Sequence, residues 1–186
     1  GKGYFSKVTQ GLPAMKGNKH AVAAGDFDGD GDLDLFLGGF GKPGSFPMSS
    51  RSYLLRNDSR EGDIRFTDVT DDICPAVKNV GMVTVASWKD LNGDQFPELV
   101  IAGDWMPVRL YHNEKGRLTD FSASVNLGET DGQWSALIVE DIDADGDVDI
   151  VLGNAGLNTQ YKPTRTQPST IHAGDFDGNG VVDPII

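Results

Sequence analysis

The chain has 186 residues with 28 acidic and 16 basic side chains, and its net charge of −12 and pI near 4.5 exclude a surface built to bind nucleic-acid phosphates. Hydrophobic residues make up 38% of the sequence, enough for a core, and no stretch approaches the ~18 apolar residues of a membrane-spanning helix. The single cysteine, Cys74, excludes an internal disulfide framework and a multi-cysteine zinc site. One domain or an equivalent set of repeats is expected, with no nucleic-acid partner and no membrane insertion.

Short apolar segments recur in pairs along the chain, and an acidic nine-residue window separates the members of each pair. The pairs are residues 21–24 and 35–37, 83–86 and 99–102, 136–139 and 150–152, and 171–173 and 185–186. Nearly continuous apolar runs of this length, bounded by Gly and Asp, predict strands that are buried on both faces. Each pair therefore predicts a β-hairpin whose turn is the acidic window.

More polar segments of alternating character lie between the hairpins. Residues 52–57 and 65–70 follow the first hairpin, residues 108–113 and 117–121 follow the second, and residues 4–9 look like the end of such a set. Two buried strands followed by two half-exposed strands form a unit of roughly 40–60 residues, which is typical of a propeller blade. No segment of ten or more residues has a helical period, and the 24 Gly residues suit many tight turns.

These units predict an all-β chain in which residues 1–186 form part of a β-propeller, about three to four blades. The expected units are residues 1–10 (the end of a blade), 20–72, 82–123, 133–168 and 169–186 (the start of a blade). The interval between the third and fourth hairpins is too short for two further strands, so we expect an extended loop or a reduced blade there.

The acidic windows span residues 26–34, 90–98, 141–149 and 175–183 and contain 16 of the 28 acidic residues. Acidic or amide side chains occupy window positions 1, 3, 5 and 9, and Gly occupies position 6 in three of the four windows. Two carboxylates about 4 Å apart repel by roughly 4 kcal/mol at an effective dielectric constant near 20, so clusters of this kind indicate an enclosed divalent cation.

Calcium is the cation that this spacing favours. It takes about 6–8 oxygen ligands, whereas magnesium keeps several waters and softer metals require Cys or His. An EF-hand is excluded because position 12, which carries a bidentate Glu in that motif, is apolar in every window. Up to four Ca²⁺ ions are expected, and window 90–98, with Gln95 in place of Gly at position 6, departs most from the pattern. The side chains at positions 1, 3, 5 and 9 and the backbone carbonyl at position 7 are the predicted ligands. These residues are Asp26, Asp28, Asp30, Asp32 and Asp34; Asp90, Asn92, Asp94, Phe96 and Glu98; Asp141, Asp143, Asp145, Asp147 and Asp149; and Asp175, Asp177, Asn179, Val181 and Asp183.

The hairpin frame resembles the FG-GAP/VCBS repeat, the blade of integrin α-subunit heads and of many bacterial secreted proteins. It is most similar to the large bacterial multi-repeat members related to cartilage acidic protein. The similar segments are residues 25–34, 66–70, 153–154, 157–158 with Tyr161, and 174–180. The resemblance implies a calcium-stabilised propeller of six to eight blades on an extracytoplasmic protein, with metal ligands at positions 1, 3, 5, 7 and 9 of each window.

Two functions remain open from the sequence. The first is a non-catalytic module, secreted, periplasmic or on the cell surface, that presents its loops to a protein or a glycan. The second is the scaffold of a secreted polysaccharide-degrading enzyme, a lyase or hydrolase, for which Tyr111, His112 and Arg109 lie close together. Alternation along a strand points neighbouring side chains to opposite faces, which favours the first function, with no catalytic residue. Because the chain lacks an initiator Met and a signal-peptide pattern, we expect it to be a segment of a longer protein.

Three further residues are assigned to the core. Cys74 has no basic neighbour that would activate its thiol, so we expect a small buried side chain rather than a nucleophile. Trp88 and Trp134 adjoin predicted buried strands and are expected to pack in the interior.

Overall fold

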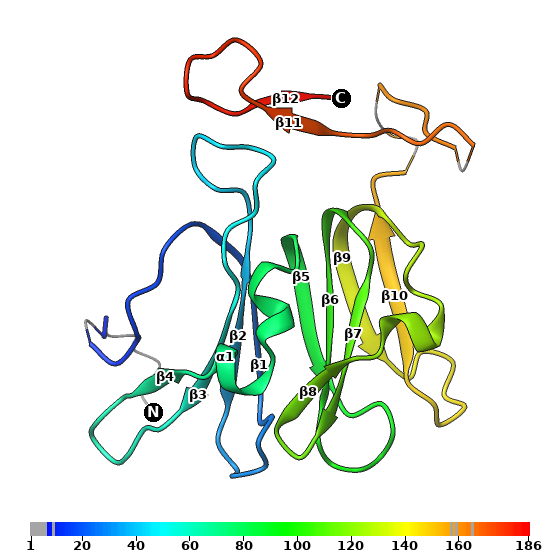
Figure 1. Cartoon of the computed structure of the whole chain (residues 1–186). Coiled ribbons are helices and arrows are strands. Elements are labelled where there is room, and N and C mark those ends of the chain that lie inside the picture. Colours follow the sequence, from blue (N-terminus) through cyan, green and yellow to red (C-terminus); the bar gives the residue numbers. More distant parts are fainter. Residues whose placement is uncertain (1–6, 9, 157, 159, 165) are drawn as a thin grey trace.

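The computed structural model describes residues 7–8, 10–156, 158, 160–164 and 166–186. Antiparallel strands dominate this part of the chain, and its longest helix has five residues, which confirms the all-β prediction (Figure 1). The strand expected at residues 4–9 lies mostly outside the described residues. Within the described ranges, no helix has the length and apolar character needed to cross a bilayer.

The first sheet contains β1 (Lys19–Gly25), β2 (Asp34–Gly39), β3 (Tyr53–Asn57) and β4 (Phe66–Asp68) in that spatial order, with each neighbouring pair antiparallel. β1 and β2 form the first predicted hairpin, and the window at 26–34 is its turn. β3 and β4 lie where the two half-exposed strands were predicted, but Tyr53, Leu54 and Leu55 of β3 are all buried, so the predicted half-exposure is wrong for β3. This sheet therefore has the strand order of the predicted four-stranded unit.

The second unit repeats this order. It contains β5 (Met82–Lys89), β6 (Glu98–Met106), β7 (Arg109–Glu114) and β8 (Arg117–Asp120), paired in sequence. An equivalent side-chain contact also occurs in both units. The Leu54 N–H donates to Thr70 Oγ1 (2.9 Å) in the first unit, and the Leu110 N–H donates to Ser122 Oγ (3.0 Å) in the second.

Two further hairpins follow. The third pairs β9 (Gly132–Glu140) with β10 (Asp149–Asn154), and the fourth pairs β11 (His172–Gly174) with β12 (Asp183–Ile185). The described residues between β10 and β11 form no strand, which corresponds to the first of the two outcomes expected there, an extended loop or a reduced blade. Three short helices, which the sequence did not predict, follow the outermost strands: α1 (Thr70–Ile73), η1 (Pro75–Asn79) and η2 (Ser122–Val125).

Strand β6 also pairs with β9, a contact that the sequence did not predict. β7 pairs with β6 only as far as Ile101, and beyond that point Gln133 of β9 pairs with Asp104 on the same edge. The register shifts at Trp105, whose φ of 58° marks a bulge that turns the end of β6. The second and third units are therefore joined by backbone hydrogen bonds as well as by packing.

β6 is the strand that fulfils the prediction of burial on both faces. Leu99 and Ile101 join a hydrophobic cluster that includes Phe36 of the first sheet, whereas Val100 joins a second cluster with Val139 of β9. All three β6 residues are fully buried. Alternate side chains of β6 thus pack toward the first sheet and toward β9, because this strand lies between them.

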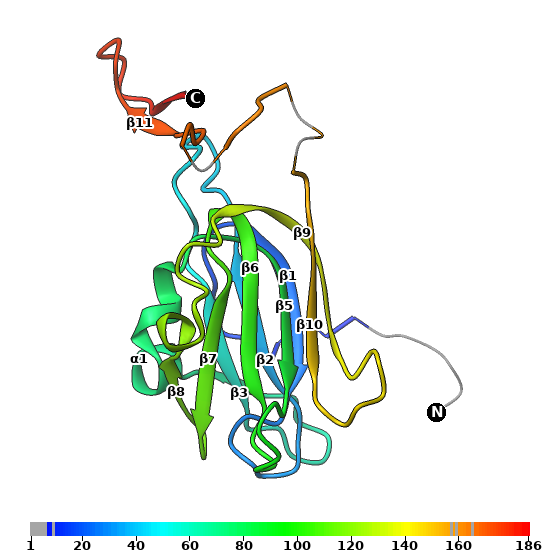
Figure 2. The ribbon, with the colours of Figure 1, turned by 90° about the vertical axis from the view of Figure 1, so that its right-hand side faces the viewer.

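The same prediction is wrong for β1 and for the β9–β10 hairpin. Val22 is 65% exposed, and the paired residues Ile138 and Val151 are 53% and 48% exposed. Within the described residues no sheet packs on these faces, because the first sheet and the β9–β10 hairpin stand at the two ends of the row (Figure 1), and in Figure 2 this hairpin lies on the side that faces the viewer. An apolar strand is therefore not enough to ensure burial; a neighbouring sheet must cover it.

Candidate metal sites

Three of the four acidic windows lie at one end of the sheets. The turns at 26–34, 90–98 and 141–149 form the lower edge of the molecule in Figure 1, and the turn at 175–183 belongs to the β11–β12 hairpin beyond the opposite end. All four windows are hairpin turns, as the sequence predicts.

The backbone of the four turns follows one scheme. Window positions 4 and 6 both have positive φ in every turn, and the residues are Gly29, Gly31, Gly93, Gln95, Ala144, Gly146, Gly178 and Gly180. Of these two positions, only the Gly at position 6 was noted from the sequence, where it permits a sharp left-handed turn. Gly at position 4 of three windows was the signal that could have identified the other position.

The side chains at positions 1 and 9 hold each turn in shape. The position 1 carboxylate accepts backbone N–H groups from inside the turn; for example, Asp26 accepts from Gly29 (2.8 Å) and Gly31 (2.9 Å). The position 9 carboxylate accepts the N–H of position 2 in all four turns, at 2.8–3.1 Å. The side-chain oxygens at positions 3 and 5 accept the N–H groups of positions 5 and 7 in each turn.

In three of the turns, the carboxylates at positions 1, 3 and 9 converge. Each residue places one carboxylate oxygen within 4.8 Å of the other two, and the groups are Asp26, Asp28 and Asp34; Asp141, Asp143 and Asp149; and Asp175, Asp177 and Asp183. The position 5 side chains, Asp30, Asp145 and Asn179, are outside these groups. The convergence of acceptor-only oxygens fits a hard divalent cation.

The first turn shows the electrostatic cost of this arrangement most clearly. Burial raises the pKa of Asp34 to about 6, although N–H donors from Asn57 and Phe27 act in the opposite direction. Burial, followed by the charge of Asp30, raises the pKa of Asp28. Among the described residues, Asp32 Oδ1 is buried without a hydrogen-bond donor. Burial and repulsion between the carboxylates thus disfavour their charged forms, which a nearby cation would favour.

The second turn differs from the other three. It has Asn92 at position 3 and Glu98 at position 9, and the Asn92 amide and the His112 imidazole both contact the Glu98 carboxylate. Within the described residues, this turn contains no converging group of three carboxylates. The polar side chains of window 90–98 thus form hydrogen bonds with one another to an extent that those of the other windows do not.

The residues proposed for an enzymatic alternative do not share a cleft. Tyr111 is 1% exposed and its pKa is raised by burial, Arg109 forms an ion pair with Asp120 at 3.4 Å, and His112 contacts Glu98. Within the described residues, His112 contacts Glu98 rather than Tyr111 or Arg109, and Tyr111 has almost no exposed surface.

The residues assigned to the core are placed there by the structure. Cys74 is 3% exposed, and burial raises the pKa of its thiol. Trp88 is 9% exposed and stacks on Phe27, with ring centroids 5.7 Å apart, and Trp134 packs partly against the second hydrophobic cluster.

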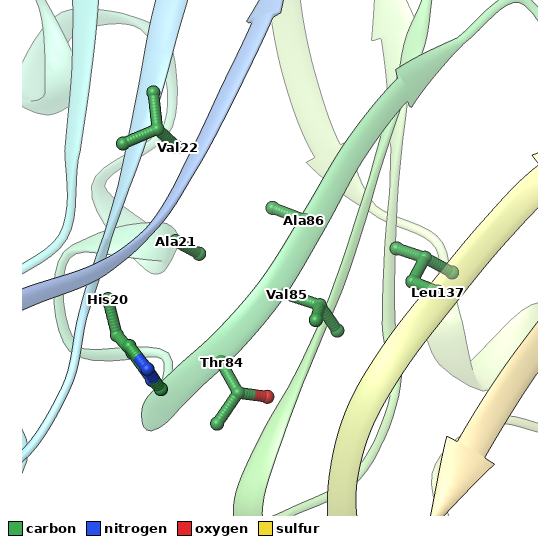
Figure 3. A pocket seen from close by; sticks show the side chains of 7 residues that line it. All are labelled: His20, Ala21, Val22, Thr84, Val85, Ala86 and Leu137. Atoms are coloured by element: carbon green, nitrogen blue, oxygen red, sulfur yellow. The ribbon is translucent and has the colours of Figure 1, made fainter.

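A pocket of about 240 Å³ lies between β1, β5 and β9 (Figure 3). Its lining residues are His20, Ala21, Val22, Thr84, Val85, Ala86 and Leu137. The Thr84 hydroxyl already donates to the carbonyl oxygens of Ala102 and Trp134. The pocket therefore offers more polar than apolar surface, and its His20 imidazole acts electrostatically on the carboxylate of Asp104.

The two non-glycine residues with positive φ in the turns give a testable prediction. Replacing Gln95 (φ 75°) or Ala144 (φ 62°) with Gly should stabilise the protein by about 0.5–1 kcal/mol. The replacement removes the strain of a left-handed L-residue, which costs roughly 1–2 kcal/mol. The larger conformational entropy that glycine loses on folding offsets part of this gain. Urea unfolding measures the change. Gly146→Ala is the matched reversal, and a gain in stability for that variant would contradict the explanation.

The pattern of repeats matches one known family. A family profile described as FG-GAP-like repeat covers residues 1–37 and 90–152, which is more than half of the chain and contains the first three acidic turns. No curated protein matches the sequence. On the strength of the family match, the repeated hairpins and the shared turn geometry, this chain belongs to the FG-GAP-like repeat family.

Proposed function

We propose that this chain is a calcium-stabilised segment of an extracytoplasmic β-propeller that binds a protein or a glycan and does not itself catalyse a reaction. The convergence of three carboxylates in each of the turns at 26–34, 141–149 and 175–183 carries the proposal. When bound, calcium supplies the positive charge that these oxygens lack and ties the two ends of each hairpin turn together. The carboxylates at positions 1, 3 and 9 would hold it, joined by position 5 and the position 7 carbonyl.

The propeller assignment draws on how the sheets are stacked. The first two units pack face to face through one hydrophobic cluster, the second unit and the β9–β10 hairpin pack through another, and the first two units have the same strand order. A row of four-stranded sheets with their turns at one end is the arrangement of neighbouring blades. We further propose that the chain is related to the large bacterial multi-repeat proteins similar to cartilage acidic protein, because residues 25–34, 66–70 and 174–180 resemble segments of those proteins.

The extracytoplasmic location follows from the proposed metal. Extracellular calcium modules commonly bind with Kd values of about 10⁻⁴–10⁻³ M, and turns of this kind would be filled where calcium is millimolar. A structural role for calcium suits a rigid binding module, because the turns would hold their shape against a ligand without a change in conformation.

Calcium binding is the first test of the proposal. Isothermal titration of calcium into the chelator-treated chain should show binding to several sites, and Asp28→Asn should remove one of them. Absence of binding at millimolar calcium would refute the metal assignment.

The binding role is tested on a glycan array that carries neutral and anionic oligosaccharides. Calcium-loaded protein should bind a defined subset, and EGTA should abolish the signal if the turns shape the binding surface. Conversion of a bound polysaccharide to an unsaturated product, seen as a rise in ultraviolet absorbance, would contradict the non-catalytic assignment.

A further inference from the structure

We propose that the turn at 90–98 closes without a metal ion, with the Asn92 amide and the His112 imidazole taking the place of the cation at Glu98. The proposal contrasts this turn with the three to which we assign calcium, and in that respect it rests on the proposed function. It departs from the expectation, based on spacing alone, that all four windows bind calcium.

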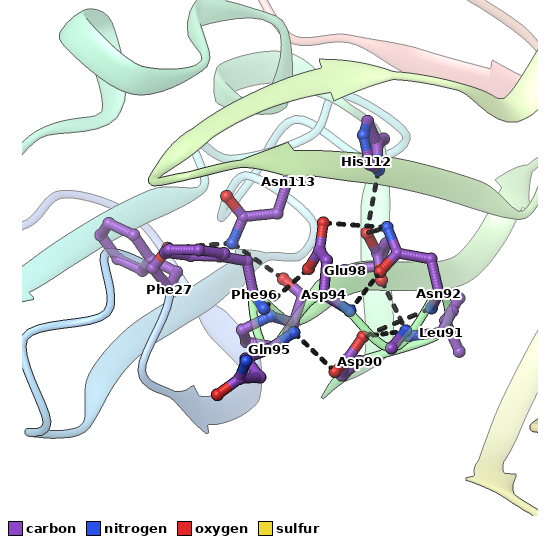
Figure 4. A network of polar contacts seen from close by, with 12 residues as sticks. Phe27, Asp90, Leu91, Asn92, Asp94, Gln95, Phe96, Glu98, His112 and Asn113 are labelled. Carbon is purple, nitrogen blue, oxygen red and sulfur yellow. Dashed lines mark hydrogen bonds and ion pairs between the residues drawn. The ribbon is translucent and has the colours of Figure 1, made fainter.

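Glu98 is buried with both carboxylate oxygens in use. The side chain is 3% exposed, and its Oε2 accepts the N–H of Leu91 at 2.8 Å, as position 9 does in every turn. Its Oε1 lies 2.9 Å from His112 Nδ1 and 3.3 Å from Asn92 Nδ2 (Figure 4). The Asn92 amide nitrogen is a donor in this contact, and His112 Nδ1 donates in the tautomer that carries its proton on Nδ1.

The hydrogen bonds of Asn92 fix the orientation of its amide. Its Oδ1 accepts the backbone N–H of Asp94 at 2.9 Å, and its Nδ2 donates to Asp94 Oδ2 at 3.1 Å and to Glu98 Oε1. A flipped amide would place NH₂ against that backbone N–H and its oxygen against two carboxylates. The position 3 side chain thus presents a donor to position 9, where the other three turns present a second carboxylate.

His112 lies beside the position 9 carboxylate of its turn, and the equivalent residue of the first unit makes a different contact. The pairing of Leu99 with Tyr111 sets His112 beside Glu98, and the pairing of Leu35 with Leu55 sets Arg56 beside Asp34 in the first unit. Arg56 pairs with Asp58 at 2.9 Å. Only in the second unit, among the described residues, does this neighbouring side chain contact the position 9 carboxylate.

The remainder of the turn is supported from within the protein. Asp90 accepts the N–H groups of Gly93 and Gln95, each at 2.8 Å. Asn113, fully buried, donates to the carbonyl oxygens of Pro97 (3.0 Å) and Phe27 (2.9 Å) and so joins this turn to the first one (Figure 4). The turn therefore keeps its shape through hydrogen bonds that need no cation.

Counting bound calcium tests the inference. Equilibrium dialysis of the full chain against ⁴⁵Ca²⁺ should give three ions per chain, and three again for Asp90→Asn, whereas Asp26→Asn and Asp141→Asn should each give two. Four ions that fall to three in Asp90→Asn would overturn the inference. No bound ions would refute the calcium assignment of the other turns, and the inference would then be decided by the next measurement.

Melting in EGTA separates the two kinds of turn without any metal. Glu98→Gln should lower the melting temperature, because its amide NH₂ must face either the Leu91 N–H or the nitrogens of His112 and Asn92. Asp149→Asn, at the same position of the third turn, should leave it unchanged or raise it, since it removes repulsion between carboxylates. A rise in both variants would contradict the inference. As a gain of function, Asn92→Asp combined with Glu98→Asp and Gln95→Gly should add a fourth calcium ion.

Discussion

Removal of calcium should lower the melting temperature of this chain by roughly 15–30 °C. At a calcium concentration one hundred times Kd, each site adds about 2.7 kcal/mol to the free energy of unfolding, and three sites add roughly 8 kcal/mol. For a chain of this size, each kcal/mol corresponds to about 2–4 °C. The effect is large because the ion removes repulsion among three carboxylates in each turn, at a place where the two strands of a hairpin meet.

Differential scanning calorimetry of the same preparation in calcium and in EGTA measures this shift. Magnesium at equal concentration is the matched control and should restore much less of the lost stability, because it prefers a smaller shell and keeps its waters. Equal melting temperatures in calcium and EGTA would contradict structural calcium sites in these turns.

Phe27→Ala should destabilise the protein by about 3–5 kcal/mol, the range for truncating a fully buried aromatic side chain. Phe27 occupies position 2 of the first turn, yet it has no exposed surface and stacks on Trp88 of β5. Its backbone N–H and C=O bind Asp34 and Asn113, and both groups remain in the variant. Urea unfolding in saturating calcium therefore reports the loss of the ring between the first two sheets.

Phe176 provides an internal control for this experiment. It occupies the same position 2 of the fourth turn and is 58% exposed. Phe176→Ala should change the free energy of unfolding by no more than about 0.5 kcal/mol. Equal losses for the two variants would show that the fourth hairpin is packed in solution as the first one is, contrary to the structure.

The hairpins and their turns were predictable from the sequence because they depend on residues close together in the chain. The positive φ at Gly31 and Gly146, and the apolar strands on either side of each window, are set within about a dozen residues. The strands that follow the first two hairpins were predicted for the same reason.

Contacts between distant segments were not predictable in this way. The pairing of β6 with β9 depends on a bulge at Trp105 and on where β7 ends. Burial of Val22 and Ile138 was predicted wrongly because a strand pattern does not specify which faces a second sheet covers. The short helices at 70–79 are likewise placed by their position beyond an outer strand rather than by a helical period.

Two pairs of equivalent residues show this division most clearly. The sequence by itself determined that Phe27 and Phe176 follow the first Asp of equivalent turns, and that Asp34 and Glu98 close equivalent windows. The tertiary structure alone decided that one Phe is buried and the other exposed, and that Glu98 meets an imidazole from β7. The reason is physical: backbone turns are governed by local dihedral angles and hydrogen bonds, whereas burial and the partner of a charge depend on which sheets pack together.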